Sequence, residues 1–182
     1  IGDNSSKDAV TPYLLELAKN VNIKMIIGNL TAKEGMLRDH WNNATKRSPL
    51  YLYKLVMTDG SEASMDNVTL GSIIKKENWS YINLEESLPF SGITDGYRNY
   101  LPAMLHYVDS LPTNPDVKIM LHQPWAYSTH TDQSFFEINY DSDQEKMFNA
   151  IVNATDEAGK LPGIYRVIPS GTAIQNGRTS YL

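Results

Sequence analysis

Serine residues near the start of the chain could supply a nucleophile. Ser5 and Ser6 follow Gly2-Asp3 in a short turn, before a helix-forming stretch that begins at Asp8. A serine at a tight strand-to-helix turn is helped by the helix N-terminus, whose N–H groups favour developing negative charge. The competing interpretation is that these side chains only cap the helix. On spacing alone we favour the cap.

A second set of candidate groups surrounds His122. The segment His122-Gln123-Pro124-Trp125 follows an apolar run, and Tyr127 comes two residues later. An imidazole at a strand end can act as a general base, and Trp125 and Tyr127 could stack on a sugar ring. For His122 we favour a structural or substrate-contacting role over a catalytic one. The remaining histidines are expected on helix surfaces, in packing contacts or in a loop: His40, His106 and His130.

Composition argues against several other functions. The chain has no cysteine, which excludes disulfides, thiolate metal sites and a cysteine nucleophile. Its net charge of −5 and its scattered basic residues disfavour a nucleic-acid partner. Asp141-x-Asp143-x-Glu145 resembles a calcium loop in spacing but lacks the loop glycine, so helix capping is the better interpretation. We expect no metal and no cofactor. We also expect no membrane span, because no apolar run approaches ~20 residues.

These groups must be positioned by alternating strands and helices. Apolar runs predict strands at 23–27, 79–84, 117–121 and 165–168. Helical spacing predicts helices at 8–20, 69–77, 97–111, 141–159 and 171–180, and residues 31–43 are expected to form a loop and a short helix. Asp59-Gly60 is typical of a hairpin turn between arms at 51–57 and 62–68. This pattern predicts an α/β domain whose mainly parallel sheet is covered on both faces.

Two expectations follow about which side chains face the core and the ligand. In the first helix, Val10, Leu14, Leu17 and Val21 recur at helical spacing and should face the core. Ligands of parallel sheets bind beyond the carboxyl ends of the strands. The segments to inspect are therefore Asp3-Asn4-Ser5, Gly28 to Gly35, Glu85-Glu86-Ser87, His122 to Trp125, and Pro169 to Thr172.

Several motifs at these positions resemble one hydrolase superfamily. They are Ile1-Gly2-Asp3-Asn4-Ser5-Ser6-Lys7-Asp8-Ala9, His40-Trp41-Asn42-Asn43-Ala44, Trp79-Ser80-Tyr81-Ile82, Trp125-Ala126-Tyr127 and Ile168 to Ser180. The chain resembles the SGNH (GDSL-like) hydrolases, and most closely a bacterial branch whose first block reads I-G-N-S-F-S-x-D-A. The last motif, with Gly171-Thr172-Ala173-Ile174-Gln175-Asn176, is the most specific, and the resemblance covers nearly the whole chain.

The resemblance implies a fold and an activity. The fold would be a flavodoxin-like three-layer α/β/α sandwich of about five mainly parallel strands, forming one domain over residues 1–182, with the 51–68 hairpin as an excursion. The activity would be hydrolysis of a small-molecule or carbohydrate ester by a serine, with backbone and amide groups holding the oxyanion and an Asp-x-x-His element supplying the base. A secreted or periplasmic location would fit.

The resemblance also assigns roles to residues of this chain. Ser5 matches the nucleophile, although a register that keeps Asp8-Ala9 aligned places Asn4 in that position instead. Gly35, or less favourably Gly28, matches the oxyanion glycine. Glu86 occupies the amide position, where a carboxylate would repel an oxyanion unless protonated. The residues expected to contact substrate are Glu85, His122, Trp125, Tyr127, Thr172 and Asn176.

Two hypotheses therefore remain open. The first is an SGNH-type esterase that removes acyl groups from a carbohydrate. The second is a non-catalytic carbohydrate-binding relative, since one register places Asn4, which cannot act as the nucleophile, in the serine position. Glu85-Glu86 at the amide position and the missing Asp-x-x-His element favour the same alternative. We expect most of the first strand and the Asp-x-x-His element to lie outside this sequence. No oligomeric state is indicated.

Overall fold

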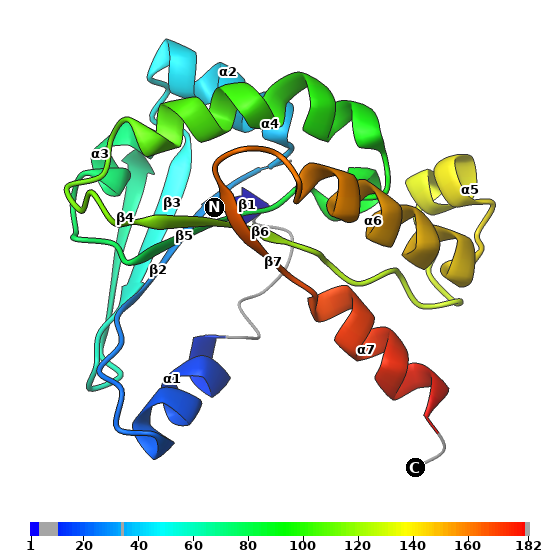
Figure 1. Ribbon diagram of the computed structural model, residues 1–182, viewed down its shortest axis with the longest axis horizontal. Helices are drawn as coiled ribbons and strands as arrows, with labels where there is room; N and C mark the ends of the chain where they lie inside the picture. The colour runs from blue at the N-terminus through cyan, green and yellow to red at the C-terminus, as the bar shows by residue number, and fades with distance from the viewer. Residues whose placement is uncertain (4–10, 34, 181–182) are drawn as a thin grey trace.

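The strands and helices alternate along the chain. The computed structural model describes residues 1–3, 11–33 and 35–180 (Figure 1). In chain order the elements are β1 (Gly2–Asp3), α1 (Thr11–Asn20), β2 (Ile27–Ala32), α2 (Leu37–Lys46), β3 (Tyr51–Val56), β4 (Glu62–Val68), α3 (Leu70–Ile74), β5 (Tyr81–Leu84), the 3-10 turn η1 (Leu88–Phe90), α4 (Thr94–Asp109), β6 (Lys118–His122), α5 (Ser134–Tyr140), α6 (Gln144–Ala158), β7 (Ile164–Ile168) and α7 (Ser170–Thr179). The predicted α/β class is confirmed.

The strands form two hydrogen-bonded sheets. The first has the order β1-β2-β3-β4 and the second the order β5-β6-β7. Strands β1 and β2 are parallel, as are β5, β6 and β7, whereas β3 is antiparallel to both of its neighbours. The sheets meet where the backbone nitrogen of Ile1 donates to the Asn83 carbonyl of β5, at 2.8 Å. Parallel pairing is thus divided between two sheets.

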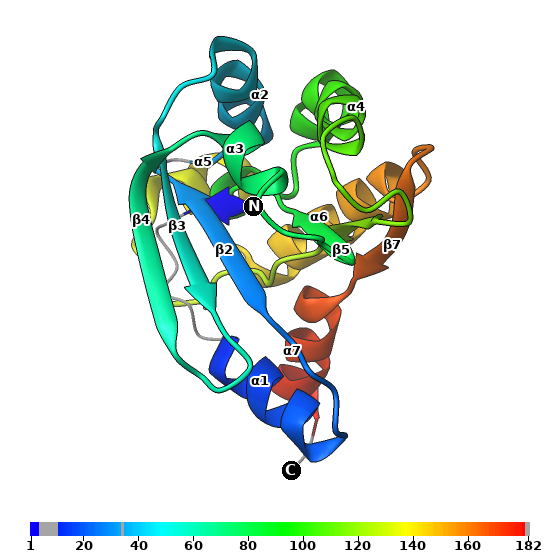
Figure 2. The same ribbon diagram turned by 90° about the vertical axis from the view of Figure 1, so that its left-hand side faces the viewer.

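The predicted hairpin is confirmed, and it extends the first sheet instead of leaving it. Figure 2 shows β3 and β4 running alongside β2. At the turn, Gly60 has φ of +90°, a conformation that glycine adopts without steric cost. The Asp59 carboxylate accepts hydrogen bonds from the backbone nitrogen (2.9 Å) and hydroxyl (2.7 Å) of Ser61. The residue types at the turn, Asp59 and Gly60, were therefore enough to predict the hairpin from the sequence.

Both sheets contribute to one hydrophobic cluster. Leu30 and Tyr53 come from the first sheet, and Leu84 and Leu121 from the second. Helix α4 contributes a face to the same cluster, including Leu101, Leu105 and Val108. In Figure 1, α2 and α4 lie on one side of the strands, and α1 and α7 lie on the other. The shared core holds the strand ends in fixed positions relative to one another.

The predicted inner face of α1 is wrong. The buried residues of this helix are Thr11, Leu15 and Ala18. Leu14, Leu17 and Val21 are 41%, 63% and 63% exposed, and Val10 lies outside the described residues. Because Tyr13, Leu14, Leu15 and Leu17 surround the helix with apolar groups, spacing alone did not select one face.

The strand after α1 begins where the sequence predicted its end. Ile23 and Ile26 are exposed, and β2 runs through Gly28 to Ala32. A Cβ on Gly28 would lie 2.6 Å from the Trp79 ring, so the strand interior requires glycine there. Gly28 therefore marks close packing, and the glycine does not end the strand.

Side chains cap two of the helices, and the cap predicted in the Asp141–Glu145 segment is confirmed. The Thr69 hydroxyl accepts from the backbone nitrogen of Ser72 at 3.2 Å, at the start of α3. Asp143 accepts from that of Lys146 at 2.9 Å, at the start of α6. The Asp141–Glu145 segment is thus a helix boundary. Within the described ranges, every helix is too short or too polar to cross a lipid bilayer.

Candidate functional site

Segments that follow four different strands meet at one edge of the sheets. After β2, the backbone nitrogen of Leu37 donates to Glu86, which follows β5. Glu85, also after β5, contacts His122 at the end of β6. Gln123 then bonds to Thr172 in the segment after β7. The carboxyl ends of parallel strands are where such folds bind ligands, so this edge is the candidate site.

Glu85 and His122 form a close pair on adjacent strands. Their Oε2 and Nδ1 atoms are 2.7 Å apart, and the side chains retain 26% and 17% of their exposure, respectively. The register of the sheet explains the contact. Leu84 pairs with Leu121, so the next residue of each strand lies side by side on the opposite face. Because the pair keeps some exposure, a solute can reach it.

The surroundings of His122 fix the ring and leave one nitrogen available. Trp125 contacts the imidazole edge-on, with ring centroids 6.5 Å apart and planes at 79°. Among the described residues, Nε2 of His122 has no hydrogen-bond partner. A neutral imidazole that donates from Nδ1 to a carboxylate carries its lone pair on Nε2. The arrangement can therefore accept a proton at Nε2.

Glu86, which the resemblance places at the oxyanion site, faces the interior. Its side chain is buried, and Oε1 accepts from the backbone nitrogens of Leu37 (3.1 Å) and Ser87 (2.8 Å). Helix α2 has no side-chain cap from Met36, and Glu86, which follows β5, instead accepts from the first backbone nitrogen of the helix. Burial raises the Glu86 pKa to about 7, against the lowering effect of these two N–H groups. Glu86 therefore acts as a structural acceptor inside the protein.

A glycine on α4 makes room for this carboxyl group. A Cβ on Gly96 would lie 2.5 Å from Oε2 of Glu86. The buried carboxyl group thus contacts the starts of α2 and α4 together. Its position depends on a close approach that any larger residue at Gly96 would prevent.

The two sequence candidates for the oxyanion glycine occupy different places. Gly35 is buried and lies two residues before Leu37, so it is at the candidate edge. Gly28 lies inside β2 against Trp79, away from the strand end. Asn4 and Ser5, the alternatives for the nucleophile, lie outside the described residues.

Gln123 is the main structural residue of this edge, and sequence reasoning did not single it out. Its Oε1 accepts from the backbone nitrogen (3.0 Å) and hydroxyl (2.7 Å) of Thr172, and its Nε2 donates to the Thr155 hydroxyl at 3.1 Å. Its carbonyl accepts from Gly171, where a Cβ would lie 2.2 Å from the Pro124 oxygen. Gln123 thus joins β6 to α6 and α7. Thr172, expected to contact substrate, serves this junction.

The expected substrate contacts separate into two groups. Glu85, His122 and Trp125 lie together at the edge. Tyr127 instead packs against Phe136, with ring centroids 5.5 Å apart. It belongs to a second hydrophobic cluster, which is formed mainly by residues of α5 and α6. Asn176 is exposed on α7, beyond the turn that Thr172 holds. Of the two aromatic residues expected to contact substrate, Trp125 is therefore the one that lies beside Glu85 and His122.

Comparison with known proteins identifies the family. The family described as a domain of unknown function, DUF4886, matches residues 1–182. The chain belongs to the DUF4886 family. It is similar to a DUF4886 family protein from Bacteroides uniformis ATCC 8492, known from a crystal structure, with 40% identity and a TM-score of 0.92. The match covers 98% of this chain and 68% of that one. No curated protein matches the sequence.

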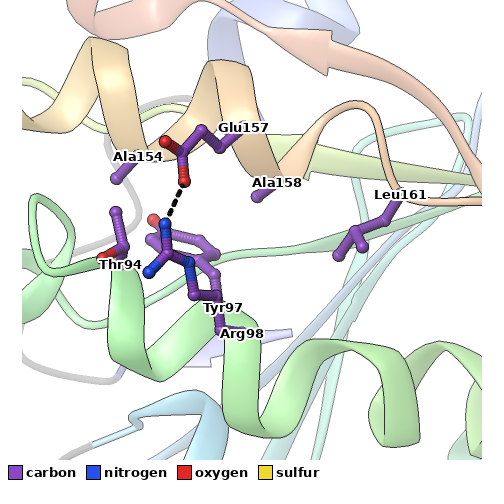
Figure 3. Close-up of a pocket in the computed structure, with 7 residues that line it drawn as sticks. All are labelled: Thr94, Tyr97, Arg98, Ala154, Glu157, Ala158 and Leu161. Atoms are coloured by element: carbon purple, nitrogen blue, oxygen red, sulfur yellow. Dashed lines mark hydrogen bonds and ion pairs between the residues drawn. The ribbon is translucent and has the colours of Figure 1, made fainter.

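This DUF4886 chain also has a pocket between α4 and α6, away from the strand ends. Figure 3 shows Arg98 and Glu157 pointing toward each other across it, 2.9 Å apart. The pocket holds about 190 Å³, and Ala154, Ala158 and Leu161 form much of its apolar lining. Its charged groups are already paired with each other. We therefore assign the chemistry to the strand-end edge.

Proposed function

We propose that this protein hydrolyses acyl esters at the carboxyl ends of its parallel strands, as an SGNH-type hydrolase, with an acylated carbohydrate as substrate. The observation that carries the proposal is the meeting of four strand-end segments at one edge. There, a partly exposed imidazole lies between a carboxylate and an indole. Acid–base groups and an aromatic surface beside them are what hydrolysis of a sugar ester requires.

The proposal includes a finer description of the fold. We take β1 and β5 to be neighbours in one continuous, flavodoxin-like sheet, which makes the molecule a three-layer sandwich. The hydrogen bond from Ile1 to Asn83 supports this, as do the helices on both sides of the strands in Figure 1.

Within this proposal, Ser5 is the nucleophile and the N–H of Gly35 is an oxyanion donor. The Ser5 assignment rests on the sequence motif. The Gly35 assignment is supported by its position between β2 and α2, next to the segment that reaches Glu86. Since Glu86 is buried and accepts hydrogen bonds, the proposal does not use it as a donor.

The nucleophile assignment is tested by hydrolysis of 4-nitrophenyl acetate. Ser5→Ala should lower kcat by ~10³-fold or more, because removing a serine nucleophile removes the covalent route. Ser6→Ala, one residue away, is the matched control and should retain the wild-type rate. Equal rates for wild type and Ser5→Ala would show that Ser5 is not the nucleophile.

The second candidate function is carbohydrate binding without catalysis. It is favoured by Glu86, which stands where the superfamily has an amide. This side chain points inward and accepts hydrogen bonds, so it cannot donate one to an oxyanion. Trp125 would then supply a stacking surface. Calorimetric titration with an acetylated oligosaccharide would show heat of binding with the ester intact. Release of acetate during the titration would exclude this alternative.

A further inference from the structure

We propose that Tyr81, Lys118, Tyr165 and Arg166 form a binding site for an acidic carbohydrate, one whose sugar carries a carboxylate, as a uronate does. These four side chains, the tyrosine–cation cluster, come from the three strands of the second sheet. Tyr81 and Lys118 are the first residues of β5 and β6. The cluster therefore lies at the amino ends of the strands, opposite the candidate edge. The inference goes beyond ester hydrolysis and does not depend on it.

The register of the sheet directs Tyr81 and Lys118 to the same face. The two residues pair with each other, and the residues that follow them, Ile82 and Ile119, belong to the shared hydrophobic cluster with α4. Successive side chains of a strand point to opposite faces, so Tyr81 and Lys118 point away from that cluster. Their face is turned toward the side on which α1 and α7 lie in Figure 1.

Strand β7 adds a second ring and a second cation. Its pairing with β6 passes from Ile164 to Arg166, so Tyr165 is an extra residue between two paired positions. The Nζ atom of Lys118 lies 4.5 Å from the centroid of the Tyr165 ring and 5.9 Å from that of Tyr81. The Cζ atom of Arg166 lies 5.6 Å from the Tyr165 centroid. The irregular register thus places two cations around one tyrosine.

The two cations of the cluster have no acidic partner within the described ranges. The ion pairs of that part of the chain join other side chains, and its hydrogen bonds involve neither Lys118 Nζ nor the Arg166 guanidinium. In a chain with a net charge of −5, they are a local excess of positive charge. A carboxylate between them would accept charge-assisted hydrogen bonds from both. The cluster therefore favours an anionic ligand.

The tyrosines favour a sugar as the carrier of that anion. Tyr81 and Tyr165 are 53% and 50% exposed. An exposed tyrosine offers an apolar ring to the C–H face of a sugar and a hydroxyl to its polar rim. A nucleic acid fits less well, because it presents many phosphates to a site of two cations on a negatively charged protein. An acidic sugar brings one carboxylate together with one ring.

The first test is isothermal titration calorimetry with trigalacturonate as the probe. The neutral galactose trimer is the comparison ligand. Wild type should bind the acidic trimer at least ~10-fold more tightly than the neutral one, because only the acidic trimer can pair with the cations. The difference should shrink as NaCl rises from ~0.05 M to ~0.5 M, because exposed charges are screened.

The second test changes the members of the cluster one at a time. Lys118→Met and Arg166→Gln remove a charge and keep a long side chain, so each should weaken binding of the acidic trimer by ~10-fold or more. Tyr81→Ala should weaken it by ~2–10-fold and keep the NaCl dependence, because both cations remain. Lys46→Met, at an exposed lysine of α2, is the matched control and should bind like wild type. Circular dichroism checks that each variant folds.

Several outcomes would overturn the proposal. These are wild-type affinity in both charge variants, equal binding of the acidic and neutral trimers, or no binding of the acidic trimer by wild type. Tighter binding of a thymidine oligonucleotide with the same number of charges would assign the cluster to nucleic acid instead. Ser5→Ala should bind the acidic trimer like wild type, so its rate of ester hydrolysis tests the proposed function separately.

Discussion

Two adjacent carboxylates lie in opposite environments. Glu85 keeps contact with solvent beside His122, whereas Glu86 is buried against the starts of α2 and α4. Strand alternation explains the difference, because Ile82, Leu84 and Glu86 occupy one face and Glu85 the other. The same rule directs Gln123 inward after Ile119 and Leu121. The orientation of these side chains could thus be read from the sequence once the strands were known.

Glu86 should make stability depend on pH. Its folded-state pKa of about 7 lies above the ordinary value of 4.5, so between these values the folded protein holds a proton that the unfolded chain releases. Stability from this group is therefore present below pH 4.5 and is lost as pH rises to about 7, by on the order of 3 kcal/mol.

Glu86→Gln tests this effect because it removes the titration and keeps an oxygen for Leu37 and Ser87. Urea midpoints would be measured at pH 5 and pH 8. Wild type should lose more stability between them than Glu86→Gln does. Glu16→Gln, at an exposed glutamate of α1, is the control and should retain the wild-type difference. Identical pH dependence in wild type and Glu86→Gln would contradict the buried-carboxyl interpretation.

At the scale of single elements, α1 shows how apolar spacing can mislead. Leu15 is 8% exposed and Leu17 is 63% exposed, although the sequence pattern placed Leu17 inward. Leu15→Ala should destabilise the protein by ~2–3 kcal/mol, from lost burial and the remaining cavity. Leu17→Ala should change stability by less than ~0.5 kcal/mol. Equilibrium urea unfolding compares the two, and a larger loss for Leu17→Ala would reverse the assigned face.

Elements with specific end signals were predicted better than elements known only from apolar runs. Asp143 and Asp59-Gly60 specify local geometry through their own hydrogen bonds and φ angles, and both were found as predicted. The 23–27 run contained no such signal, and β2 lies further along. Helix α5 was missed because it has only 7 residues and is held by Phe136 and Tyr140 packing in the second cluster.

The candidate site depended on contacts that one strand cannot encode. The sequence placed His122 and Glu85 at strand ends, but their contact requires the register that pairs Leu84 with Leu121. That register is set by packing between β5 and β6, which are separated by η1 and α4. For the same reason Thr172 and Tyr127 could not be separated from the site before their partners Gln123 and Phe136 were known.

At the scale of the whole molecule, the two sheets should unfold together because they share one hydrophobic cluster. Leu101 of α4 is fully buried in this cluster, with Leu30 and Tyr53 from the first sheet and Leu84 and Leu121 from the second. Leu101→Ala should therefore lower the free energy of unfolding by ~2–5 kcal/mol in both sheets alike. A local effect would reach only one of them.

Native-state hydrogen exchange measures this coupling directly. Peptides from β2–β3 and from β5–β6 should lose the same protection in Leu101→Ala, because both open through the same global unfolding. Leu50→Ala, at a position 63% exposed, removes the same atoms without opening the core and should leave protection in both sheets unchanged. If Leu101→Ala weakened only one set of peptides, the sheets would be independent units. The edge that holds Glu85 and His122 would then rest on the second sheet alone, because Glu85 directly follows β5 and His122 ends β6.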